Sequence, residues 1–249
     1  MRVWVAAWAC LGLVSAADLH YSQEELEKEA RKQTVFYDSL VRLQSVSTRH
    51  FLCGNELQFS SDAGLLVTAE PKNDQHSSLW MLGSAAESPA HNYDRALRCD
   101  DVVTLTAMGL DRRLRADSQP SPLSKNGLVS TLGRDGEIAP GERFKLVCAN
   151  QNTGSTVVGA TEFHLFNEAL GNYVFASRSH IFNANNCGRN CPIMNELEVC
   201  AVRAKSSDTK WRVYNGVFFA HKEAAPASDK WVYAADEPFP GEEGLGGEL

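Results

Sequence analysis

The sequence lacks three features that would define its class at once: a long apolar run, an excess of positive charge and a catalytic signature. Beyond residue 17 no stretch approaches the roughly 20 apolar residues of a membrane helix. Acidic residues outnumber basic ones by 31 to 24, which argues against a non-specific nucleic-acid binder, because such proteins need a basic surface. The chain contains no Gly-x-Ser-x-Gly elbow, His-Glu-x-x-His helix or phosphate-binding glycine loop. We therefore expect no enzyme, no metal site and no cofactor.

The composition is that of a globular protein. Hydrophobic residues make up 43% of the 249 residues and charged residues 22%, with 18 glycines and 9 prolines. These values exclude a collagen-like, low-complexity or wholly disordered chain. The length is sufficient for one large domain or two small ones with a substantial core.

Residues 1–17 have the pattern of a secretory signal peptide. Arg2 is the only charge, Val3 to Val14 is apolar, and small residues follow at Ser15 and Ala16. The alternative is a membrane anchor, for which this run is too short. Removal of the signal also removes Cys10, so the seven cysteines become six. An even number in an oxidising compartment suggests up to three disulfides.

Both ends of the remaining chain differ from its middle. Residues 18–36 are predicted to form an N-terminal helical leader, because Ser22 and Glu25 match a capping box. Residues 221–249 are rich in Pro, Gly, Asp and Glu, which is typical of a flexible acidic tail.

The middle of the chain is predicted to be all-β. Short alternating runs are separated by Gly, Asn, Asp and Ser clusters. A Val/Phe-x-Leu strand recurs with leucines 62 and then 60 residues apart, and each unit closes with an aromatic residue. These positions are Leu43, Leu105 and Leu165 for the leucines and Trp80, Phe144 and Trp211 for the aromatics. Three units of four strands can close a barrel, which predicts a β-trefoil with the aromatics in its core, not on a sugar-stacking surface. A β-sandwich is the alternative.

Particular residues resemble a known family. Residues 121–124 (Ser-Pro-Leu-Ser), followed by Asn126 and Val129-Ser130, resemble the second repeat of stromal cell-derived factor 2 and its relatives. Residues 211–218, with Trp211 and Gly216-Val217-Phe218, are similar to the closing strand of that family. The resemblance implies a β-trefoil of three MIR repeats within residues 37–220, at about 37–90, 91–150 and 155–220.

The sequence also departs from that family. Residues 52–55 and 114–117 stand where the family often carries a Leu-His-Ser-His type segment, so the resemblance does not carry a role of those histidines over to this chain. Phe144 replaces a tryptophan, and Asn183 to Asn190 form an inserted loop. The seven scattered histidines are predicted to be surface or hydrogen-bonded strand residues.

The resemblance implies a non-enzymatic binding module of the endoplasmic reticulum lumen. It would be an accessory factor of chaperone complexes with Hsp40- and Hsp70-type proteins, recognising unfolded or mannosylated clients in quality control. Alternatives are a glycan-binding trefoil lectin, secreted or lumenal, and a rigid surface protein. Glu248 and Leu249 agree with the end of a Lys/His-Asp-Glu-Leu retrieval signal, although a coincidental acidic terminus remains the alternative.

The cysteines suggest a partial disulfide map. Cys99 and Cys148 match the cysteines that flank the second repeat of the family and are predicted to pair, closing a loop of about 50 residues. Cys200 is expected to pair with Cys187 or Cys191, and Cys53 with the remaining one. A zinc site at these cysteines with His180 is the alternative, which a secreted chain makes less favourable.

A basic cluster is the candidate ligand-binding surface. By strand alternation, two of its arginines flank an apolar Leu114 on one outer face, where they would bind an acidic peptide, a sulfated glycan or phosphate. The alternative is a solvated face with ion pairs. The cluster consists of Arg112, Arg113, Arg115, Lys125 and Arg134.

Overall fold

The computed structural model describes residue 28 and residues 31–60, 64–72, 76–85, 95–133 and 137–217. The predicted signal peptide, the acidic tail with Glu248 and Leu249, and Arg134 lie outside these residues. No helix in the described ranges is long and apolar enough to cross a membrane.

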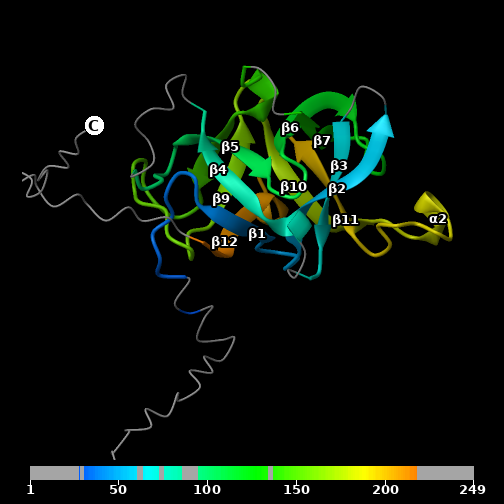
Figure 1. Ribbon diagram of the computed structural model, residues 1–249, viewed down its shortest axis with the longest axis horizontal. Coiled ribbons are helices and arrows are strands. Elements are labelled where there is room, and N and C mark those ends of the chain that lie inside the picture. The colour runs from blue at the N-terminus through cyan, green and yellow to red at the C-terminus, as the bar shows by residue number, and fades with distance from the viewer. Residues whose placement is uncertain are drawn as a thin grey trace, which may run out of the picture.

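The described residues are all-β, as predicted, and form twelve antiparallel strands (Figure 1). In chain order these are β1 (Leu40–Ser45), β2 (Phe51–Ser60), β3 (Gly64–Glu70), β4 (Trp80–Ser84), β5 (Val102–Ala107), β6 (Arg112–Pro120), β7 (Gly127–Gly133), β8 (Phe144–Cys148), β9 (Phe163–Asn167), β10 (Asn172–Ile181), β11 (Leu197–Val202) and β12 (Lys210–Val217). Short helical turns lie at η1 (His76–Ser78), η3 (Pro140–Glu142), α2 (Ala184–Cys187) and η4 (Ser207–Thr209).

Six of the strands close a ring. Strand β1 pairs with β4, β4 with β5, β5 with β8, β8 with β9, β9 with β12, and β12 again with β1. Figure 1 shows this last contact, where β1 lies beside β12 although the two strands come from opposite ends of the fold. A closed ring has no unpaired sheet edge.

The other six strands form three hairpins that pair with one another. The hairpins are β2–β3, β6–β7 and β10–β11, and each contributes its second strand to the pairs β3–β7, β7–β11 and β11–β3. A ring of six strands with a triangle of hairpins agrees with the β-trefoil that the strand spacing predicts.

The predicted repeat positions occupy the core. Leu43, Leu105 and Leu165 are fully buried, and so are the three aromatic residues that close the units. The indole of Trp80 donates to the carbonyl of Leu52 at 2.8 Å. Trp211 donates in the same way to the carbonyl of Val174 at 3.0 Å. The prediction that these aromatics are core residues is confirmed.

The end of the predicted helical leader is extended, which corrects the sequence prediction. Thr34 and Phe36 form isolated β bridges with Val158 and Ala96, and the Val35 amide donates to the carbonyl of Val157 at 3.0 Å. Val35 is fully buried. Pairing with two distant segments therefore outweighs the local helical preference, and the fold begins before residue 37.

Candidate functional site

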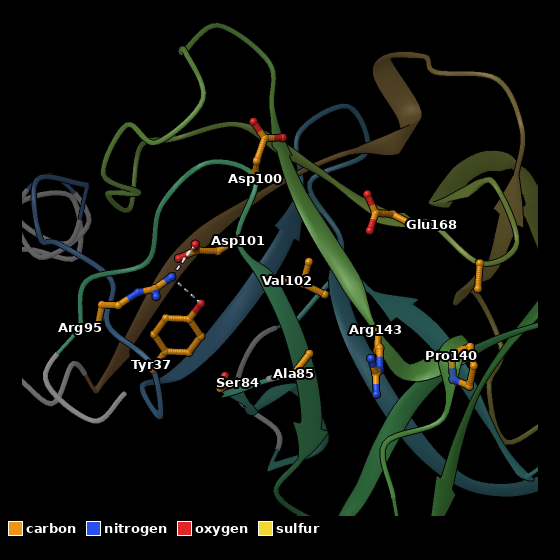
Figure 2. Close-up of a pocket in the computed structure, with 11 residues that line it drawn as sticks. Tyr37, Ser84, Ala85, Arg95, Asp100, Asp101, Val102, Pro140, Arg143 and Glu168 are labelled. Atoms are coloured by element: carbon orange, nitrogen blue, oxygen red, sulfur yellow. Dashed lines mark hydrogen bonds and ion pairs between the residues drawn. The ribbon is translucent and has the colours of Figure 1, made fainter. Parts of the chain in front are cut away.

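A pocket of about 510 Å³ lies where the end of β4, the start of β5 and the residues flanking β8 and β9 meet. Its apolar lining comes from Ala85, Val102, Pro140 and Ala169. The polar lining residues are Tyr37, Ser84, Arg95, Asp100, Asp101, Arg143 and Glu168. Figure 2 shows Asp100 and Glu168 toward one end of this pocket and Arg143 toward the other, with Val102 between them.

On one side of the pocket, Arg95, Asp101 and Tyr37 are hydrogen-bonded to one another through the Arg95 guanidinium. Arg95 Nη2 donates to Asp101 Oδ1 at 2.6 Å and to the Tyr37 hydroxyl at 3.4 Å (Figure 2). The Arg95 guanidinium also lies over the Tyr37 ring, 5.3 Å from its centroid. Burial, followed by the charge of Asp101, raises the pKa of the Tyr37 hydroxyl. The phenol therefore stays protonated, and its ring face is already covered by a cation.

The two ends of the pocket carry opposite charge. Asp100 accepts from the Thr153 hydroxyl at 2.5 Å, and Glu168 forms an ion pair with Lys145 of β8. Hydrogen bonding to Glu168 raises the pKa of Lys145, and the charges of Glu168 and Asp100 add to this shift. At the other end, Arg143 Nη2 donates to the carbonyl of Ile138 at 3.3 Å, and its buried Nε has no hydrogen-bond partner among the described residues.

Two of the four described residues of the predicted basic cluster pair with carboxylates. Arg113 forms an ion pair with the buried Glu142 at 3.3 Å, and Arg115 with Asp117 at 3.0 Å. Lys125 donates to the carbonyl of Pro122 at 2.8 Å. Arg112 is half-buried in β6, where it pairs across the sheet with Ala107 and Gly133. Two arginines of the cluster therefore form the ion pairs that the alternative expects, and a ligand-binding role of the cluster stays a prediction.

The Ser-Pro-Leu-Ser motif forms a loop that closes over a buried carboxylate. Glu198 of β11 is fully buried and accepts from the backbone amides of Leu123 at 2.6 Å and Ser124 at 2.9 Å. The Ser121 and Ser124 hydroxyls are 2.9 Å apart. Because a buried carboxylate must be hydrogen-bonded, the motif fixes the β6–β7 hairpin against β11. Its role in the structure is to hold two segments together.

The disulfide map agrees with one prediction and corrects the others. Cys99 and Cys148 are bonded, with their Cα atoms 5.5 Å apart. Cys187 of the inserted loop pairs with Cys191, which directly follows that loop, and the loop projects beyond the strands with α2 in Figure 1. The expected bonds from these two cysteines to Cys200 and Cys53 are therefore wrong, and the zinc alternative loses two of its thiolates.

Sheet order explains why Cys53 and Cys200 stay apart. Strand β3 lies between β2, which carries Cys53, and β11, which carries Cys200. Strands two places apart are separated by about 10 Å, which exceeds the Cα distance of about 7 Å that a disulfide tolerates. Both thiols are free and fully buried, and burial raises their pKa, to about 11 for Cys200. Such thiols are unreactive.

Two histidines in the described ranges, His50 and His164, are hydrogen-bonded, in agreement with the prediction. His164 Nδ1 lies 2.8 Å from the Thr209 hydroxyl, and burial lowers its pKa to about 4. His50 Nδ1 lies 2.9 Å from the carbonyl of Thr48. No group of three or more His, Cys, Asp or Glu side chains suited to a metal occurs in the part of the chain that the structure describes.

A second polar cluster, which the sequence did not indicate, joins Glu196, just before β11, to β2 and β3. Thr68 donates to Glu196, and Asn55 donates to the Thr68 hydroxyl at 2.6 Å. Burial raises the pKa of Glu196 to about 7, and the charge of Glu70 adds to this effect. Glu196 is thus partly protonated near neutral pH.

This shift predicts how stability depends on pH. A carboxyl whose folded pKa lies above its unfolded value stabilises the fold at low pH, and the contribution is lost as pH rises through the folded pKa. Because Glu196 is partly exposed, we expect the free energy of unfolding to fall by about 2 kcal/mol between pH 5 and pH 8. Urea unfolding at both pH values measures this difference. In Glu196→Gln the decrease should largely disappear, and an unchanged decrease would contradict the assignment.

The chain is similar in sequence to known proteins. The chain is 24% identical to a stromal cell-derived factor 2-like protein from Dictyostelium discoideum over 217 residues, covering 84% of this chain and 93% of the relative. It is 25% identical to stromal cell-derived factor 2-like protein 1 from Bos taurus over 191 residues, covering 76% and 80%. The resemblance to this family is confirmed. No family model matches the chain.

Solved structures agree on the fold. The SDF2-like protein from Arabidopsis thaliana superposes with a TM-score of 0.66 at 21% identity, covering 75% of this chain and 98% of that one. A protein O-mannosyltransferase Pmt1–Pmt2 complex from S. cerevisiae superposes with a TM-score of 0.61 at 18% identity, covering 78% of this chain and 27% of that one. At these identities the likeness concerns the fold alone.

Proposed function

We propose that the chain is a non-enzymatic binding module of the endoplasmic reticulum lumen, built as a β-trefoil of three MIR repeats at about 37–90, 91–150 and 155–220. In this role it is an accessory factor of chaperone complexes that contain Hsp40- and Hsp70-type proteins, and it binds unfolded client polypeptides during quality control. The similarity to stromal cell-derived factor 2-like proteins over 84% of the chain supports this assignment. The predicted signal peptide and the two disulfides support passage through an oxidising compartment.

The observation that carries the proposal is a charged pocket on a closed, cross-linked scaffold. Asp101 and Glu168 are each held by a cation, so the pocket walls are preorganised. Paired charges of this kind fix the shape and polarity of a binding site. A general acid or base needs a group free to exchange a proton with a substrate. The pocket chemistry therefore favours recognition over catalysis.

Binding to unfolded polypeptides tests the proposal. The signal-cleaved chain is immobilised and exposed to one protein in two forms, native and permanently unfolded by reduction and alkylation. We expect saturable binding of the unfolded form and little binding of the native form. Equal retention of both forms, or of neither, would contradict the proposal.

Retention of the chain in the lumen is a separate test. A tag placed between the signal and residue 18 leaves Glu248 and Leu249 free at the terminus. We expect the tagged chain to be retained in cells and to be secreted when these two residues are deleted. Identical secretion with and without them would remove the lumenal assignment.

A glycan-binding lectin, secreted or lumenal, is the second candidate. The presence of Asp100, Glu168 and Arg143 around one pocket favours it, because carboxylates and guanidinium groups form the hydrogen bonds that orient a polar ligand. A glycan array separates the two functions. Clear saccharide specificity without binding of unfolded polypeptide would favour the lectin.

A further inference from the structure

We propose that the pocket binds an extended polypeptide segment of five residues with a basic side chain at one end, an apolar side chain in the middle and an acidic side chain at the other end. This inference rests on the proposed function and names the client chemistry that it requires. The basic side chain pairs with Asp100 and Glu168, the apolar one contacts the floor at Val102, and the acidic one pairs with Arg143.

Charge complementarity assigns the two ends. At one end of the pocket, the two negative charges of Asp100 and Glu168 exceed the single positive charge of Lys145, so that end attracts a cation. Arg143 forms no ion pair that the structure shows within the described residues, and its half-buried side chain lines the pocket. A charged donor with open hydrogen-bonding capacity favours a carboxylate as its partner. Arg95 lies on a separate side of the pocket, where it pairs with Asp101.

The register of β5 and β8 sets the length of the ligand. Val102 lies opposite Lys145 in this antiparallel pair. Asp100 lies in the turn two residues before β5 begins, and Arg143 directly precedes β8, so the register of the pair places their backbones four positions apart. Four positions of extended backbone span about 13 Å, which is the upper limit for this separation because Asp100 lies outside the strand. In an extended peptide, residues one, three and five face the same side and span the same distance.

The aromatic content of the pocket favours polypeptide over carbohydrate. Sugars commonly pack against an open aromatic face, whereas Tyr37 is the only aromatic side chain that lines the pocket in the described residues. Its ring is covered by the Arg95 guanidinium. The floor between the charged ends is aliphatic, with Val102, Ala85 and Pro140. Such a surface suits a small apolar side chain.

Fluorescence anisotropy with a labelled pentapeptide tests this inference. The probe has lysine first, valine third and glutamate fifth, with serine between them and both termini blocked. The control peptide has the same composition with the glutamate moved to position four, where it faces away from Arg143. We expect the control to bind at least about tenfold more weakly, because it loses a charge-assisted hydrogen bond. Binding of the first peptide should also weaken as salt rises, since salt screens its end charges.

Two variants test the assigned contacts. Arg143→Gln and Asp100→Asn should each weaken binding of the probe about tenfold or more, and Arg143→Lys should restore part of the loss. Asparagine suits position 100, because the backbone there has a φ of 72°, a conformation that asparagine tolerates. Arg203→Gln, an exposed position on the loop after β11, is the matched control and should bind like the wild type. Circular dichroism confirms that each variant is folded.

The outcomes separate this inference from the proposed function. Suppose that the wild type binds unfolded polypeptide. The site assignment is then overturned if Arg143→Gln and Asp100→Asn bind the probe as tightly as the wild type does, or if the probe and the control peptide bind equally. Binding of the unfolded polypeptide without binding of the probe has the same consequence. If the wild type binds a saccharide and no polypeptide, both the proposed function and the site assignment fail.

Discussion

Replacing Trp211 by alanine is expected to lower the free energy of unfolding by about 3–5 kcal/mol. Trp211 is fully buried in β12, which pairs with β1 and β9 and so closes the ring of strands. The substitution leaves a cavity at this closure. It also removes the donor to the carbonyl of Val174, and an unsatisfied buried carbonyl adds to the cost.

A conservative variant retains part of the packing at this site. Trp211→Phe keeps one six-membered ring in the core and removes the indole N–H together with the second ring, so we expect a smaller loss of about 1–3 kcal/mol. The second unit has Phe144 in the matching place, which shows that the ring can fill this position without the donor. Urea unfolding of both variants gives the two values. A loss below about 1 kcal/mol for the alanine variant would mean that β12 is not part of the cooperative core.

Removal of the Cys99–Cys148 bond is the second large expected effect. The bond closes a loop with a sequence separation of 49. In the loop-entropy model the variant Cys99→Ala/Cys148→Ala should lose about 4 kcal/mol. Cys99 directly precedes Asp100, and its bond to Cys148 joins the segment just before β5 to the end of β8. It therefore holds the two strands whose register sets the length of the pocket.

The second disulfide is a matched control. Cys187 and Cys191 have a sequence separation of only 4, so the same model gives about 2 kcal/mol for Cys187→Ala/Cys191→Ala. Chemical unfolding of both double variants under one set of conditions measures the difference. An equal or reversed order would show that chain entropy does not govern these bonds.

The interior of the fold was predictable because its signal is periodic. Spacings of 62 and 60 residues identified three leucines, and all three are fully buried. The same spacing relates Val35, Leu97 and Val157, which lie on the three segments joined by isolated bridges. The helical prediction for residues 34–36 failed because it used only local signals, and the bridges formed there join residues more than 50 positions apart.

The pocket was less accessible to sequence reasoning. Its residues come from five separate segments around Tyr37, Ala85, Asp100, Arg143 and Glu168, and none of these segments carries a local motif. The basic cluster was the more visible signal, since three of its arginines are close in sequence. The acids that pair with two of these arginines include Glu142, which is about 30 residues away and comes close only through the fold. Charge along the chain is therefore a poor guide to charge on the surface.

Sheet order also limited the disulfide prediction. Parity and compartment indicated six paired cysteines, whereas the described ranges contain two bonds and two buried thiols. The position of β3 between β2 and β11 decides the outcome for Cys53 and Cys200. That order depends on the contacts between hairpins, which no spacing within the chain displays.

The most direct test of the proposed function is quantitative affinity capture from the lumen. The full chain, tagged after its signal, is recovered alongside an unrelated lumenal resident carrying the same tag, and the bound proteins are measured by mass spectrometry. The proposed function predicts enrichment of Hsp40- and Hsp70-type chaperones and of unfolded clients with the wild type. The pocket assignment predicts that Arg143→Gln loses the clients. Recovery of no chaperone component, under conditions in which the other resident retains its own partners, would contradict the proposed function.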